Sequence, residues 1–217
     1  WPESELVLLG GIPRLGLMAE FAADTDEEAR QMAAAAEKTI QSFGLATHIT
    51  ATQSEANKFW TIRRESFKLL RENVSDKHTA PFIDDFVVRP EYLPEFLPRL
   101  YAILDEYNLL YTVAGHVGDG NFHIIPLMDF TRPDFVKIVN ELSDRVYTLV
   151  GEYHGSITGE HNDGLIRTPY LYKMFNPEIL NVFQEIKEIF DPHRIFNPHK
   201  KVDPKIEYLH TAIKKHS

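Results

Sequence analysis

Residues 109–127 read LLYTVAGHVGDGNFHIIPL, and this stretch decides the fold that the sequence predicts. Two apolar runs, 109–114 and 121–127, flank a glycine-rich connection, which is typical of a β-hairpin. If the strands pair antiparallel around the Gly-Asp-Gly turn, His116 and His123 fall opposite each other. Paired residues on neighbouring strands have Cβ atoms about 5 Å apart, so both imidazoles can reach one metal ion. The alternative is that the two histidines only satisfy hydrogen bonds at the hairpin.

The segments outside the hairpin alternate between strand and helix. A helix with Asp24 as its capping candidate ends at Gly44, and Asn176-Pro177 opens a helix that ends near Phe190. Two rounds of strand–helix–strand–helix predict an α+β fold, namely a duplicated ferredoxin-like antiparallel sheet with helices on one face, plus a C-terminal helical segment. No sequence repeat marks the duplication. The further expected strands are 15–22, 45–51 and 82–88, and the further helices are 53–71, 91–107 and one that begins at a Thr131 cap.

The chain divides into three segments on this interpretation. Residues 1–14 are a connecting segment, residues 15–190 form the domain, and residues 191–217 are a C-terminal tail rich in Pro, His and Lys.

Composition excludes several classes of protein. The 217 residues include 32 acidic and 23 basic side chains, a net charge of -9, which argues against nucleic-acid binding. There are no cysteines, so disulfides, thiol catalysis, iron–sulfur ligation and cysteine zinc sites are excluded. The apolar stretches are shorter than the ~20 residues that a membrane-spanning helix needs. Any metal must therefore bind to His, Asp, Glu or backbone oxygen.

A second glycine-rich stretch, GSITGEHNDG at 155–164, places Glu160 next to His161. A bend bounded by glycines can direct both side chains into one cleft. One carboxylate and two imidazoles supply three protein ligands and leave a position open, the arrangement of a catalytic rather than a structural zinc site. His161 is then a base or supports a ligand. The alternative is a solvated loop with a helix cap.

Three segments together resemble a known family: GHVGDGNFH (115–123), TGEHNDG (158–164) and DPHRIFNPHK (191–200). The sequence is similar to the C-terminal half of FAD-linked 2-hydroxy-acid oxidoreductases, the D-lactate, D-2-hydroxyglutarate and glycolate dehydrogenase group. The similarity extends from about residue 60 to residue 201. It implies a substrate domain that covers a flavin, with the FAD bound mainly by an N-terminal half that is absent from this chain. The isolated chain is then expected to be inactive.

The resemblance also implies roles for individual residues. His116, His123 and Glu160 match the family's metal ligands, and His161 matches the active-site histidine beside the substrate hydroxyl. Arg63 matches the arginine that pairs with the substrate carboxylate; on its own it reads as surface charge on a helix. Near the tail, Asn197 matches a residue that approaches the flavin ring. Zinc suits two histidines and one glutamate best, and manganese or iron also fits.

Departures from the family pattern bear on the substrate. This chain has Ile125 and Phe67 where some D-2-hydroxyglutarate enzymes carry polar residues, and Asp84 and Asp85 lie near the expected position of their distal lysine. A second substrate carboxylate would lack partners. We therefore expect a monocarboxylate, D-lactate or glycolate, which is oxidised to the 2-oxo acid.

Two other classes of function remain open. One is a metal-binding ferredoxin-like module with a structural or partner-docking role, and the other is a metal-dependent hydrolase. On the dehydrogenase interpretation, the partners are the small 2-hydroxy acid and the FAD-binding domain of the same protein or of a partner chain. The expected location is the cytoplasm or the periphery of a membrane.

Overall fold

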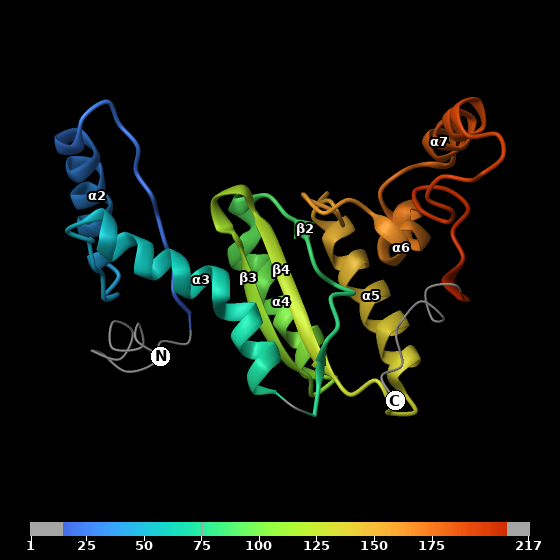
Figure 1. Cartoon of the computed structure of the whole chain (residues 1–217), viewed down its shortest axis with the longest axis horizontal. Helices are drawn as coiled ribbons and strands as arrows, with labels where there is room; N and C mark the ends of the chain where they lie inside the picture. Colours follow the sequence, from blue (N-terminus) through green and yellow to red (C-terminus); the bar gives the residue numbers. More distant parts are fainter. Residues whose placement is uncertain (1–14, 75, 208–217) are drawn as a thin grey trace. The chain divides into compact units, whose positions relative to one another are not determined.

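The computed structural model describes residues 15–74 and 76–207, without the side chains of residues 66–73. The chain divides into two compact units, Trp1–Asn73 and Val74–Ser217 (Figure 1). This division falls inside the segment 15–190 that we expected to form the domain. The connecting segment expected at 1–14 lies outside the described residues.

In its described part, the first unit consists of two helices, α2 (Asp26–Gln41) and α3 (Gln53–Asn73). Thr25, not the expected Asp24, caps α2, because its side-chain oxygen accepts a hydrogen bond from the Glu28 N–H at 3.3 Å. The strands expected at 15–22 and 45–51 were wrong: within the described residues neither segment pairs with another strand.

The second unit contains an antiparallel sheet in which β4 (Asn121–Met128) is central. One edge of β4 pairs with β3 (Leu110–His116), and the other edge pairs with the two short strands β1 (His78–Thr79) and β2 (Phe86–Val87). The expected hairpin is thus present, and the strand expected at 82–88 is much shorter. The duplicated ferredoxin-like arrangement is not confirmed, since the described residues form one sheet only.

The register of the hairpin differs from the expected one. His116 lies opposite Asn121, and Ala114 lies opposite His123. The reason is the connection, in which the short 3₁₀ turn η2 (Val117–Asp119) and the left-handed Gly120 move the pairing by two residues. A shift of two residues keeps each side chain on the same face of the sheet. His116 and His123 are therefore diagonal neighbours, with ring centroids 6.0 Å apart.

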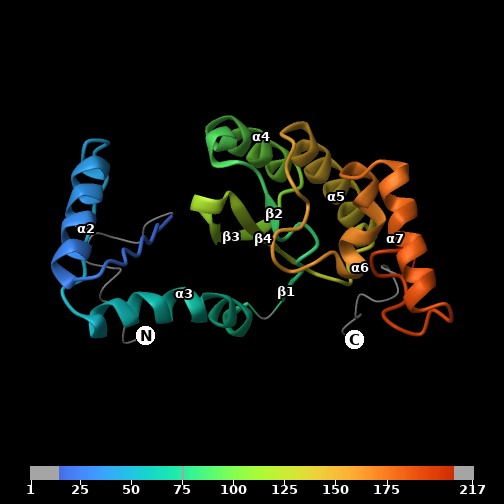
Figure 2. The same cartoon turned by 90° about the horizontal axis from the view of Figure 1, so that it is seen from above.

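Helices cover one face of this sheet. The turn η1 (Pro90–Tyr92) leads into α4 (Leu93–Asp105), and α5 (Phe135–Glu152) follows β4. Figure 2 shows α4 and α5 on the same side of the β3–β4 hairpin. The core between them is apolar, and its fully buried members from the strands and helices include Phe86, Ile124, Phe96, Leu100, Leu142 and Val146.

Two helix starts differ from the expected positions. The helix expected at 91–107 does start late, after η1, but it then continues through Pro98. The helix expected from a Thr131 cap begins at Phe135, because Asp129 already accepts the Thr131 hydroxyl and N–H in a tight turn.

After α5 the chain runs through a loop to the short helix α6 (Gly164–Arg167), the turn η3 (Thr168–Lys173) and α7 (Pro177–Phe190). The backbone of Val87 exchanges two hydrogen bonds with Ser156, at 2.7 and 2.8 Å, which places this loop beside β2. Since β2 itself pairs with β4, the loop lies close to the strand that carries His123.

A glycine in the hairpin turn is expected to be essential for stability. Gly120 has a φ of +68°, and a Cβ there would overlap the carbonyl oxygen of Val88. We expect Gly120→Ala to lower the free energy of unfolding by about 1–3 kcal/mol, measured by urea denaturation. Gly118→Ala is the matched control from the same turn, because a Cβ there meets no atom within 4 Å. Equal effects of the two substitutions would contradict this account of the turn.

Candidate metal centre

Four side chains converge on one face of the hairpin. His116 ends β3, His123 lies in β4, and Glu160 and His161 come from the loop that pairs with β2. The Oε1 atom of Glu160 is the common point of the cluster. It lies 2.9 Å from Nε2 of His123, 3.5 Å from Nε2 of His116 and 3.6 Å from Nε2 of His161.

Exposure differs within this cluster. The side chain of His123 is only 9% exposed, whereas those of His116, Glu160 and His161 are 46–50% exposed. The cluster therefore has one buried member and three that face solvent, so a small molecule can reach it.

A buried carboxylate holds the loop that carries Glu160 and His161. Asp85 is fully buried, and its two oxygens accept hydrogen bonds of 2.9–3.2 Å from the three successive backbone N–H groups of residues 159–161. The amide of Asn121 donates a further bond at 3.1 Å. Burial alone raises the pKa of Asp85, but the hydrogen bonds from these N–H groups outweigh it, and the pKa lies below its ordinary value. Asp85 is thus ionised, and hydrogen-bond donors of the protein already occupy its two oxygens.

A second buried carboxylate, on Asp84, contacts the imidazoles. Its Oδ1 lies 2.9 Å from Nδ1 of His123, and its Oδ2 lies 3.4 Å from Nδ1 of His161. The hydrogen bond to Asp84 raises the pKa of His123 above its ordinary value in spite of burial, and the negative charges of Glu160 and Asp85 act in the same direction.

The donor set fits a divalent metal ion. Two ligands bound at ~2.0–2.1 Å to a tetrahedral zinc lie roughly 3.4 Å apart, close to the spacing of the Nε2 atoms from Glu160. Candidate ligand atoms of Asp85, His123, Glu160 and His161 all lie within 4.8 Å of one another. The oxygens of Asp85 are already engaged by N–H groups, whereas Nε2 of His116 lies 3.5 Å from Oε1 of Glu160.

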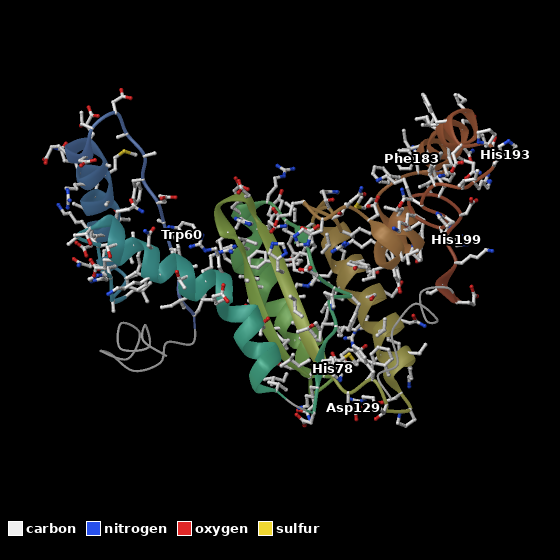
Figure 3. All side chains as sticks on the ribbon, in the orientation of Figure 1. Trp60, His78, Asp129, Phe183, His193 and His199 are labelled. Carbon is white, nitrogen blue, oxygen red and sulfur yellow. The ribbon has the colours of Figure 1, made fainter. Side chains whose placement is uncertain are left out.

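The other two predicted site residues lie on other elements of the chain. Arg63 lies on α3 in the first unit, and its predicted contact with the substrate stays a prediction. Asn197 lies in the tail after α7, where its side-chain oxygen accepts a hydrogen bond from Lys200 at 3.2 Å. Its predicted role near a flavin also stays a prediction. Figure 3 shows His78 at the end of the sheet opposite the hairpin turn, away from this cluster.

Sequence reasoning did not assign Asp84 and Asp85 to the centre. The available signal was a pair of adjacent aspartates between apolar residues, FIDDFVV at 82–88, where two charges need buried partners. Those partners lie about 40 to 75 residues further along the chain, so no local pattern indicates them.

The carboxylate of Asp191 holds the tail that carries Asn197, and it is expected to stay ionised at low pH. Asp191 accepts backbone hydrogen bonds from Ile195 and Phe196 at 2.9 Å. Its ion pair with Lys187 at 2.6 Å, supported by these bonds, lowers the pKa of Asp191 to about 2. A lowered pKa means that the stabilising contribution is complete above the ordinary value near 4 and disappears only as the pH falls toward 2.

We therefore expect the amides of Ile195 and Phe196 to keep their hydrogen-exchange protection factors at pH 3. In Asp191→Asn the protection should already be lower at pH 7. Loss of protection near pH 4 in the unmodified protein would show that Asp191 titrates normally.

Comparison with known proteins identifies the class. Residues 14–201 match the family of FAD linked oxidases, C-terminal domain. The chain belongs to this family, which confirms the resemblance seen in its motifs.

Among its relatives is a D-2-hydroxyglutarate dehydrogenase of Pseudomonas putida, 32% identical over 88% of this chain and 19% of the relative. Another D-2-hydroxyglutarate dehydrogenase, of Xanthomonas citri pv. viticola, is 32% identical over 85% of this chain and 39% of the relative. The glycolate oxidase subunit GlcD of Escherichia coli is 29% identical over 72% of this chain and 31% of the relative. The chain thus spans less than half the length of these curated relatives. None of the described helices has the length and hydropathy to span a membrane.

Proposed function

We propose that this chain is the substrate- and metal-binding half of a flavin-dependent dehydrogenase that oxidises a D-2-hydroxy acid to the 2-oxo acid. The observation that carries the proposal is the convergence of three imidazoles on Oε1 of Glu160 within a member of the FAD-linked oxidase family. The FAD is bound mainly by another domain, of the same protein or of a partner chain.

Each residue of the cluster then has a distinct task. His116, His123 and Glu160 hold the divalent metal, with zinc preferred and manganese or iron as alternatives. When bound, the metal supplies Lewis acidity at the hydroxyl of the 2-hydroxy acid, and the flavin supplies the hydride acceptor. His161 takes the hydroxyl proton at Nε2, a task for which an imidazole near neutrality is suited.

Two residues outside the cluster complete the proposal. Arg63 pairs with the substrate carboxylate through two parallel hydrogen bonds. Asn197 approaches the flavin ring from the C-terminal tail.

A small monocarboxylate, D-lactate or glycolate, is the favoured substrate. Ile125 stands two residues after His123 on the same face of β4, which makes this face apolar beside the cluster. Asp84, Asp85 and Glu160 already bring three carboxylates together, and the nearby Arg167 guanidinium is already engaged by Asp85 and the Asp84 carbonyl, so a second substrate carboxylate would meet repulsion. The side chain of Phe67, the other apolar departure, lies outside the described side chains.

D-2-hydroxyglutarate is the second candidate, because two of the relatives above carry its name. The deciding experiment mixes the complete protein, with its flavin-binding half, anaerobically with D-lactate, glycolate or D-2-hydroxyglutarate. We expect flavin absorbance to bleach fastest with a monocarboxylate. Bleaching with D-2-hydroxyglutarate alone would shift the assignment to the dicarboxylate, and no bleaching with any 2-hydroxy acid would contradict the proposed function.

A further inference from the structure

One buried carboxylate lies between the proposed base and a proposed metal ligand. Oδ1 of Asp84 is 2.9 Å from Nδ1 of His123, and Oδ2 is 3.4 Å from Nδ1 of His161. The two imidazole rings stack, with centroids 4.9 Å apart and planes at 16°. Their Nδ1 atoms therefore face the same carboxylate, while their Nε2 atoms face Glu160 on the other side.

The position of Asp84 is fixed by its neighbours. Its side chain is 10% exposed, and its backbone carbonyl accepts hydrogen bonds from Nε and Nη2 of Arg167, at 3.2 and 2.6 Å. The next residue, Asp85, has a φ of +65° and is held by the N–H groups of residues 159–161. The Asp84 carboxylate cannot easily turn away from the two rings.

An ionised carboxylate only accepts hydrogen bonds, so an imidazole that bonds to Asp84 presents an Nδ1–H to it. Oε1 of Glu160 makes the same demand on Nε2 of His123, at 2.9 Å, until a metal ion takes that lone pair. A neutral imidazole with its proton on Nδ1 has a free lone pair on Nε2. That lone pair is what a metal needs from His123 and what proton abstraction needs from His161. The contact to His161 is long for a hydrogen bond, as is common for such contacts before substrate binds.

We infer that Asp84 is a positioning residue that fixes the Nδ1–H tautomer of both His123 and His161. One carboxylate thereby prepares a metal ligand and the proton acceptor together. The inference rests on the proposed function for its consequences, but the tautomer of His161, which is not a proposed ligand, can be measured in the metal-free protein. That of His123 is measured with zinc bound, because Oε1 of Glu160 lies 2.9 Å from its Nε2 and favours a proton there when no metal is bound.

Asp84→Asn gives the most informative test, because asparagine keeps the shape but offers one acceptor oxygen and one NH₂ donor. The NH₂ group forces the imidazole that it faces to carry its proton on Nε2. We expect the oxygen to stay with His123, whose contact is shorter and more buried, so that His161 changes tautomer. In the complete protein, kcat should then fall by about 10²–10⁴-fold while metal affinity changes little.

Asp84→Ala removes both acceptors. We expect it to lower metal affinity by about 10–100-fold in addition to lowering kcat, because an unsupported histidine is a poorer ligand. The comparison of the two substitutions separates the effect on the base from the effect on the ligand.

The measurement is ¹⁵N NMR of histidine-labelled complete protein at a pH where His161 is neutral, metal-free for His161 and with zinc bound for His123. The unmodified protein should show Nδ1–H at His123 and His161, and Asp84→Asn should convert one of them. His116, for which the described structure shows no contact with Asp84, serves as the internal reference. Glu55→Gln is the matched control, since Glu55 contacts His48 at 2.8 Å in the first unit, and it should change neither kcat nor metal affinity.

Conversion of His123 in place of His161 would support the same assignment, with metal affinity lowered instead. An Nε2–H tautomer at His161 of the unmodified protein would overturn it, and this result needs no variant to fold. Loss of kcat in Asp84→Asn with both tautomers unchanged would also overturn it, since Asp84 would then act only on stability. Failure of the unmodified protein to bind metal or to reduce its flavin contradicts the proposed function. The tautomer of His161 in the metal-free protein then still tests the inference about Asp84.

Discussion

Replacing His116 with alanine in the complete protein is expected to abolish tight metal binding and to lower turnover on the order of 10³-fold. The Nε2 atom of His116 lies 3.5 Å from Oε1 of Glu160, and without it the centre keeps only one of its two imidazole ligands. The estimate for turnover follows from the loss of several kcal/mol of charge stabilisation by the metal. Metal content after gel filtration and steady-state rates measure the two effects.

His48→Ala is the matched control for this substitution. His48 is also largely exposed and also lies beside a glutamate, Glu55, at 2.8 Å, but the described structure shows no second imidazole there. We expect metal content and turnover to stay unchanged. Full activity in a metal-free His116→Ala protein would end the proposal.

The second large effect is expected from His161→Gln. If His161 takes the hydroxyl proton and does not hold the metal, kcat should fall by about 10²–10⁴-fold while metal content stays that of the unmodified protein. The side chain is half exposed, so the substitution should leave the melting temperature almost unchanged. Loss of the metal together with kcat would instead make His161 a ligand, and an unchanged kcat would exclude it as the base.

The sequence predicted the part of the fold that local pattern determines. Two apolar strands around a glycine turn, 109–114 and 121–127, are present as a hairpin. The register was wrong by two residues, because the turn at Val117–Asp119 and the left-handed Gly120 close the hairpin with fewer residues than the expected pairing of His116 with His123 requires. An even shift preserves the face of each side chain, which is why His116 and His123 still lie together.

Elements that depend on distant partners were predicted less well. The segments 15–22 and 45–51 have strand-like composition, but a strand needs a neighbour to bond with, and the sequence does not show which neighbour is available. The same limitation applies to the centre. Glu160 and His161 stand out by their glycine-bounded motif, whereas Asp84 and Asp85 gain their meaning only from contacts with the hairpin and the 159–161 loop.

The most direct test of the metal centre is a crystal structure of the active, zinc-loaded complete protein with anomalous data collected at the zinc edge. The account predicts one anomalous peak within about 2.0–2.1 Å of Nε2 of both His116 and His123, with a Glu160 oxygen at a similar distance. Zinc found only elsewhere in protein that reduces its flavin with a 2-hydroxy acid would contradict the account.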